Sequence, residues 1–181
     1  TQIVCYCGHL YAGRGVEELL ACAQTMPDVL FLFAGGNSAD VLKYEREAAS
    51  IGLANVQFSG FIANADVPRY LFAADVLAMP YTEQTGSAQF MSPMKMFEYM
   101  ASGRPIVATN FPSVREILRD GQNAILVKAG DAAALRQGLL KALGDGPAVG
   151  LGEQALQDVL SHTWRQRAER ILEFIGEPQG G

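Results

Sequence analysis

The chain has 181 residues, of which 49% are hydrophobic and 18% charged, and its formal net charge is −5. This length fits one domain with a sizeable core, and the acidic balance argues against a nucleic-acid partner, which would favour a basic face. No apolar run approaches the roughly 20 residues of a membrane-spanning helix, and we expect no signal peptide. Three cysteines without metal-ligand spacing favour a reducing, cytoplasmic setting over a disulfide scaffold or a metal site.

Strand and helix patterns alternate along the whole chain. The expected strands cover residues 3–6, 29–34, 56–61, 76–79, 106–109 and 124–127. The expected helices cover residues 15–25, 40–50, 67–74 and 113–118, with a further helix between Pro93 and Gly103 and an amphipathic one at 164–174. This alternation predicts an α/β fold, a Rossmann-like parallel sheet of about six strands with helices on both faces, followed by C-terminal helices. Such sheets bind ligands at the carboxyl ends of their strands.

The loop after the first strand combines glycines with basic side chains. Gly8, Gly13 and Gly15 let the backbone turn tightly and approach a ligand. Arg14 stands just before the helix, where a cation can meet a phosphate beside the helix N-terminus. His9 is the weaker candidate, because a neutral imidazole binds phosphate less strongly than a guanidinium does. The alternative is a plain turn with solvent-exposed charge.

The helix after the fourth strand is the most informative segment. Ser92 and Pro93 suit an N-cap and a first helical position, and Gly103 suits the end of the helix. Free N–H groups and the positive end of the dipole make such a helix start suitable for a phosphate. Glu98 lies one to two turns in, among apolar neighbours, where its carboxylate could accept hydrogen bonds from a ribose diol. Lys95 is either a phosphate or sugar contact or a solvated lysine, and both interpretations stay open.

The segment 92–109 resembles the donor-site signature of the retaining, two-domain (GT-B) glycosyltransferases of the glycosyl transferases group 1 family. A subset of that family has Ser-Pro-Leu-Lys-Leu-Phe-Glu-Tyr-Met-Ala here, and Met94 and Met96 replace the two leucines. The resemblance covers residues 3–175. It implies that residues 1–175 are the C-terminal donor-binding half of such an enzyme, that 176–181 form a disordered tail, and that an N-terminal acceptor domain is missing from this chain.

The resemblance also implies an activity and partners. Such enzymes transfer a sugar from a nucleoside-diphosphate donor, for example a UDP- or GDP-sugar, to an acceptor hydroxyl with retention of the anomeric configuration. They need no metal and no further cofactor, because positive groups and helix dipoles stabilise the leaving diphosphate. Their last helix crosses back toward the other domain. We therefore expect this chain to bind the donor but not to transfer sugar, and the parent enzyme could associate with a membrane through its missing half.

The resemblance assigns a role to several residues of this chain. It implies a diphosphate site made of His9, Arg14, Met91, Ser92, Met94 and Lys95, a ribose contact at Glu98 and a base contact at Gly60 and Phe61. For Gly60 and Phe61, an ordinary strand end is an equal alternative, and for Phe58 a core position is favoured.

The catalytic residues stay unassigned, because only one of the family's two carboxylates is present. The first carboxylate would stand eight residues before Glu98, which is Phe90, and Glu83 is the only acid in the longer loop.

Two other classes of function stay open. A sugar-nucleotide 2-epimerase shares the fold but needs both domains and an acid pair that the sequence does not show. A stand-alone nucleotide-binding α/β module is also compatible with the pattern, since a fold does not fix a function. Nucleotide binding and solution behaviour discriminate between these readings.

Overall fold

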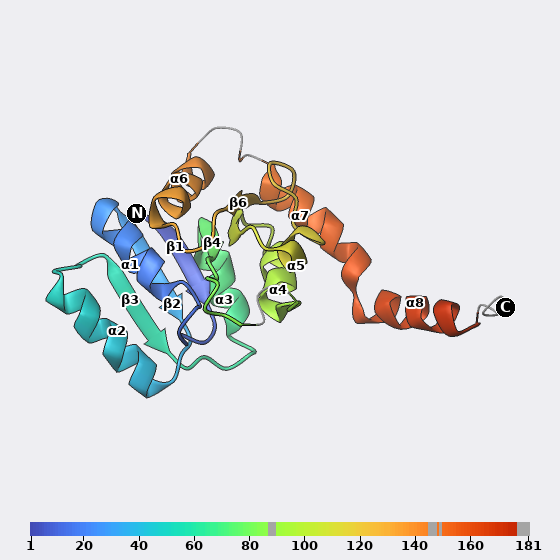
Figure 1. Cartoon of the computed structure of the whole chain (residues 1–181), viewed down its shortest axis with the longest axis horizontal. Coiled ribbons are helices and arrows are strands. Elements are labelled where there is room, and N and C mark those ends of the chain that lie inside the picture. The colour runs from blue at the N-terminus through green and yellow to red at the C-terminus, as the bar shows by residue number, and fades with distance from the viewer. Residues whose placement is uncertain (87–89, 145–147, 149, 177–181) are drawn as a thin grey trace.

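The computed structural model describes residues 1–86, 90–144, 148 and 150–176. Within these residues, the strands form one parallel six-stranded sheet of order β3-β2-β1-β4-β5-β6 (Figure 1). They are β1 (Gln2–Cys7), β2 (Val29–Ala34), β3 (Val56–Gly60), β4 (Val76–Met79), β5 (Ile106–Thr109) and β6 (Ile125–Val127). The predicted α/β fold and its parallel sheet are confirmed.

The helices lie on both faces of this sheet. They are α1 (Val16–Thr25), α2 (Ser38–Ser50), α3 (Val67–Ala73), α4 (Met94–Ser102), α5 (Pro112–Arg115), α6 (Ala132–Leu143), α7 (Leu151–Val159), a 3-10 turn (Leu160–His162) and α8 (Trp164–Gly176). One apolar cluster joins the sheet to α1, α2 and α6, and a second joins it to α3, α4, α5 and α7. Within the described ranges, no helix is long and apolar enough to span a bilayer.

The central strands are buried because helices cover them on both sides. Side chains of β1 alternate between the two clusters: Val4 and Tyr6 face the α1 side, whereas Cys5 and Cys7 face the α4 side. Both thiols are free and buried. β1 lies between β2 and β4 in the sheet, so the chain order reverses beside it. This switch point is where the loops after β1 and β4 separate and where doubly wound sheets bind ligands.

Some element limits differ from the expected ones for local reasons. Helix α2 begins at Ser38 instead of residue 40, because the Asn37 side chain caps it by accepting a hydrogen bond from the Asp40 N–H at 2.9 Å. The expected helix at 113–118 is the single turn α5, Pro112–Arg115. Gly176, expected in the tail, ends α8, and the rest of the expected tail lies outside the described residues.

Helix α8 leaves the body of the domain (Figure 1). None of its described side chains is buried, and Trp164, Leu172, Phe174 and Ile175 are exposed apolar residues. The expected amphipathic helix at 164–174 therefore forms, but its apolar side chains are left exposed by the part of the chain that the structure describes.

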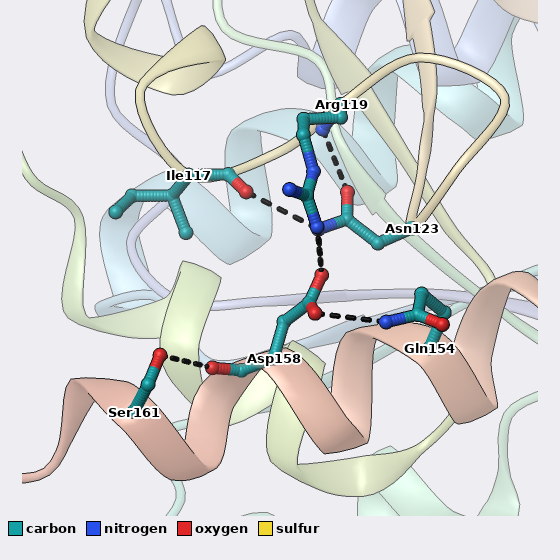
Figure 2. A network of polar contacts seen from close by, with 6 residues as sticks. All are labelled: Ile117, Arg119, Asn123, Gln154, Asp158 and Ser161. Carbon is teal, nitrogen blue, oxygen red and sulfur yellow. Dashed lines mark hydrogen bonds and ion pairs between the residues drawn. The ribbon is translucent and has the colours of Figure 1, made fainter.

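A polar network ties the loop before β6 to α7 (Figure 2). Asn123 is fully buried; its Oδ1 accepts from the Arg119 N–H at 2.6 Å, and its Nδ2 donates to Ile117 O at 3.2 Å and to Asp158 Oδ2 at 2.7 Å. Asp158 also pairs with the Arg119 guanidinium at 2.6 Å and accepts from Gln154 at 2.9 Å. Partial burial alone would raise the pKa of Asp158, but these hydrogen bonds and the Arg119 charge lower it.

Replacing Asn123 tests this network. Asn123→Ala leaves the Arg119 N–H and the Ile117 carbonyl without their partner, so we expect the free energy of unfolding to fall by about 1–3 kcal/mol. Urea denaturation followed by circular dichroism measures the change. Gln122→Ala, at an exposed neighbouring position, should change the free energy of unfolding by less than about 0.5 kcal/mol. Equal losses for the two variants would contradict the role of the network.

Candidate functional site

The loops that follow β1 and β4 are packed against each other at the switch point. The Gly13 carbonyl accepts hydrogen bonds from the Thr82 N–H at 2.9 Å and from Thr85 Oγ1 at 2.7 Å. Gly15 has a φ of +79°, and a Cβ there would lie 2.0 Å from Pro80 O. Only glycine allows this approach. The sequence predicts that both loops border the site, and the contact between them shows how they are held together.

Arg14 stands on this joint surface. Its guanidinium carbon lies 4.8 Å from the centroid of the Tyr81 ring, in the geometry of a cation–π contact. Tyr81 is itself buried, and burial raises the pKa of its phenol while the Arg14 charge opposes that rise. Arg14 is half-buried, directly before α1, in the place predicted for a phosphate-binding cation.

Lys95, in the first turn of α4, reaches the same place from the other side. Its Nζ lies 3.9 Å from the centroid of the Tyr6 ring and 5.4 Å from that of Tyr81. The nitrogen is buried and has no hydrogen-bond partner among the residues that the structure describes. Burial lowers the pKa of Lys95 to about 7, and the nearby Arg14 charge acts in the same direction. The alternative of a solvated lysine is therefore wrong.

Gly8 makes room for this ammonium group. Its φ is +136°, and a Cβ at this position would lie only 2.6 Å from Lys95 Nζ. The backbone of the β1–α1 loop thus passes directly beside the nitrogen. Gly8, Arg14 and Lys95 were all candidates from the sequence, and the structure brings them together. The aromatic pair of Tyr6 and Tyr81 that surrounds Lys95 was missed, because neither tyrosine belongs to a motif.

His9 occupies a different environment from Arg14. Its ring is exposed and stacks on Tyr11, with the ring centroids 4.8 Å apart and the planes 5° from parallel. Its backbone carbonyl accepts a hydrogen bond from the Tyr6 hydroxyl at 2.6 Å. The imidazole therefore lies at the surface of the loop, and the loop is anchored through the main chain of His9.

The start of α4 differs from the expectation in its cap. Pro93, not Ser92, is the residue before the first helical position, and no side chain caps the helix. Met91 is half-buried against the second cluster, whereas Ser92 and Met94 are exposed. Ser92 and Met94 line a hollow of about 560 Å³ between α4 and the start of α8, shared with Phe97, Ile117, His162, Thr163, Trp164, Arg167 and Arg170. Neither Arg14 nor Lys95 lines that hollow.

Glu98 is exposed, so the expectation that it is sheltered among apolar residues is wrong. Met96, Tyr99 and Met100 face the core, and Glu98 lies on the solvent side of α4. It borders a hollow of about 250 Å³ between α3 and α4, lined also by Asn64, Val67, Pro68, Leu71, Phe72, Ala101 and Ser102. No hydrogen bond or ion pair within the described part of the chain engages its carboxylate.

The end of β3 is exposed as well. The strand ends at Gly60, which has a φ of +69°, and the Phe61 ring is 86% exposed. Phe61 borders a shallow hollow of about 500 Å³ beside α3. Phe58 stacks on Phe33 with the ring centroids 4.7 Å apart and packs against the first cluster, which confirms its core position.

Two further expectations concern acids and metals. Phe90, which stands where the family has its first carboxylate, is exposed, and so is Glu83. Among the described residues, no group of three or more His, Cys, Asp or Glu side chains could hold a metal ion.

Known proteins resemble this chain in sequence and in structure. The D-inositol 3-phosphate glycosyltransferase of Corynebacterium diphtheriae is 28% identical over 189 residues, which cover 98% of this chain and 43% of that protein. The solved sucrose-phosphate synthase from Thermosynechococcus elongatus superposes with a TM-score of 0.83 at 24% identity, over 96% of this chain and 44% of that one. Anabaena HepE, solved with UDP and glucose, superposes with a TM-score of 0.80 at 22% identity, over 97% of this chain and 48% of that one. The chain thus spans less than half the length of each of these proteins.

The fold of these solved structures is the GT-B fold, and the six-stranded domain described above matches one half of it. The sequence model of the family described as glycosyl transferases group 1 matches residues 1–145, which include both loops of the switch point and the whole of α4. The chain therefore belongs to the glycosyl transferases group 1 family.

Proposed function

We propose that this chain is the donor-binding half of a retaining glycosyltransferase that uses a nucleoside-diphosphate sugar. The observation that carries the proposal is the meeting of Arg14 and Lys95 at the switch point, beside the N-terminus of α4. Two cations that approach one tyrosine ring repel each other, and a diphosphate between them would relieve that repulsion. Anabaena HepE, which shares the fold, was solved with UDP, and this supports a nucleotide as the ligand.

The other contacts follow from the positions of the side chains around this centre. The uncapped N–H groups of α4, near Met91, Ser92 and Met94, would receive phosphate or sugar oxygens, and His9 would approach from the loop surface. Glu98 faces solvent with a free carboxylate, which suits two hydrogen bonds from a ribose diol. The half-buried Gly60 backbone and the exposed Phe61 ring would border the base.

In the proposed reaction, the bond between the anomeric carbon and the diphosphate breaks, and a bond to the acceptor oxygen forms on the same face of the sugar. The products are the glycosylated acceptor, the nucleoside diphosphate and a proton. Positive side chains and the helix start would stabilise the leaving diphosphate without a metal or another cofactor. The missing half would supply the acceptor site.

Free buried thiols at Cys5, Cys7 and Cys22 favour a cytoplasmic setting.

Nucleotide binding is the first test. We expect UDP, GDP or ADP to bind saturably in calorimetric titration, and Arg14→Ala to weaken that binding about 10- to 100-fold through the loss of a charged hydrogen-bond donor. Arg46→Ala, on the exposed side of α2, is the matched control and should leave the affinity unchanged. If none of the three diphosphates binds, or if both variants bind equally well, the proposed site is wrong.

The proposed contact between Glu98 and the ribose can be tested by comparing a ligand that has a ribose with one that has none. Glu98→Gln keeps the shape of the side chain but removes the charged acceptor, so nucleoside-diphosphate binding should weaken about tenfold. Binding of inorganic pyrophosphate, which has no ribose, should be unchanged. Titrations with both ligands measure the difference, with Glu45→Gln on α2 as the control. Equal weakening for the two ligands would indicate a disturbed diphosphate site instead of a ribose contact, because the loss of a carboxylate charge alone favours an anionic ligand.

The missing half gives a third expectation. The chain should bind the sugar donor of its preferred base without releasing nucleoside diphosphate above the rate in buffer, because no acceptor side closes the site. Chromatography of the nucleotide after incubation measures this release. Release at a rate that scales with the concentration of the chain would show that this half alone is catalytic.

A further inference from the structure

The ammonium group of Lys95 is buried without a compensating partner. Its nitrogen lies over the Tyr6 ring, at 3.9 Å from the centroid, and beneath the Gly8 backbone, and no described residue accepts a hydrogen bond from it. Aromatic faces attract a cation, but they do not replace the hydration that a charged amine loses on burial. This nitrogen therefore lacks an acceptor among the described residues, beside Gly8 of the loop after β1 and Tyr81 of the loop after β4.

The groups that face Lys95 do not supply a full counter-charge. They are Cys5, Tyr6 and Cys7 from β1, Arg14 from the β1–α1 loop, Tyr81 from the loop after β4, and Glu98 from α4 itself. Burial raises the pKa values of the thiols and phenols, so these groups are neutral near pH 7. Arg14 is a second cation and opposes the charge on Lys95, whereas the exposed Glu98 carboxylate favours it. With a pKa of about 7, about half of the free chain carries a neutral Lys95 at neutral pH.

We propose that Lys95 is a diphosphate-binding cation that becomes fully charged only when the ligand arrives, so that nucleoside-diphosphate binding takes up a proton. The inference rests on the proposed function, since it places the diphosphate beside Arg14 and the start of α4. An anion there supplies the missing acceptor and separates the two cations. In the free chain, the neutral amine avoids the repulsion from Arg14.

The relation between the pKa of Lys95 and ligand affinity determines the direction of the proton transfer and the pH range in which it occurs. The ligand raises the pKa of Lys95, so protons are taken up between the free value of about 7 and the higher value of the complex. At pH 7 about 0.5 proton should be taken up for each ligand bound, and at pH 8 about 0.9. Affinity should fall about 50-fold from pH 7 to pH 9. Terminal phosphates lose their second proton near pH 6, below this window.

The experiment is calorimetric titration of the full chain with UDP, GDP and ADP in pairs of buffers that differ in ionisation enthalpy. At one pH, the difference in observed heat between two buffers gives the number of protons taken up. The expected result is an uptake that grows from pH 7 to pH 8, together with the fall in affinity up to pH 9. A nucleotide that binds with no proton uptake at pH 8 overturns the inference and leaves the proposed function intact. If no nucleotide binds, both fail.

Three variants identify the group that takes up the proton. Lys95→Met, which keeps an unbranched side chain without the amine, should abolish the uptake and remove the fall in affinity above pH 7. His9→Gln should retain the uptake, because the His9 ring is exposed and stacks on Tyr11 at the surface of the loop. Lys128→Met, at an exposed position, should behave like the wild type. An uptake that persists in Lys95→Met, or that disappears in His9→Gln, would assign the proton elsewhere and overturn the inference.

Discussion

The contact between the loops after β1 and β4 is the constraint on which the site depends. It consists of one carbonyl, that of Gly13, which accepts two hydrogen bonds, and of one glycine, Gly15, which lies against Pro80 too closely for any other residue. The β1–α1 loop carries Arg14, and Tyr81 belongs to the loop after β4. Without this contact, the cation and its aromatic support would lie on two independent surface loops. With it, they form one surface at the point where the sheet reverses its order.

Tyr81 and Tyr6 then determine how the two cations share this surface. Both cations lie near the Tyr81 ring, and Lys95 also lies over Tyr6. A carboxylate in place of a tyrosine would pair with the cations permanently and compete with an anionic ligand. Aromatic faces hold cations more weakly, and the Lys95 ammonium keeps its hydrogen-bond donors unused among the described residues. The arrangement therefore holds two basic side chains on one surface without a permanent counter-charge, as the proposed diphosphate site requires.

The sequence predicts the fold well because the signals are local. Alternating apolar strands and amphipathic helices give the parallel sheet, and Gly103 marks the end of α4 as its left-handed conformation requires. The exposure of Glu98 was predicted wrongly, because its apolar sequence neighbours lie on the opposite side of the helix and bury themselves without it. The surroundings of Lys95 come from Tyr6, Gly8 and Tyr81, which belong to other segments of the sequence than Lys95 itself. Periodicity describes one segment at a time, so it does not reveal such a contact.

Burial of Lys95 has an energetic consequence for the free domain. A lysine whose pKa is lower in the folded chain than in the unfolded chain disfavours folding; the cost is complete below the folded pKa and is lost as the pH rises to the unfolded pKa. A methionine in the same place would carry no such cost, and the neighbouring positions 94 and 96 are in fact methionines. The amine is therefore not explained by the stability of this domain. An anionic ligand would reduce the cost of burying Lys95, because it would convert an uncompensated charge into an ion pair. Its binding would also stabilise the loop that covers Lys95. On this argument, Gly8, Tyr6 and Tyr81 hold Lys95 in position for the proposed anionic ligand. The burial of Lys95 lowers the folding stability of the domain as long as no ligand is bound.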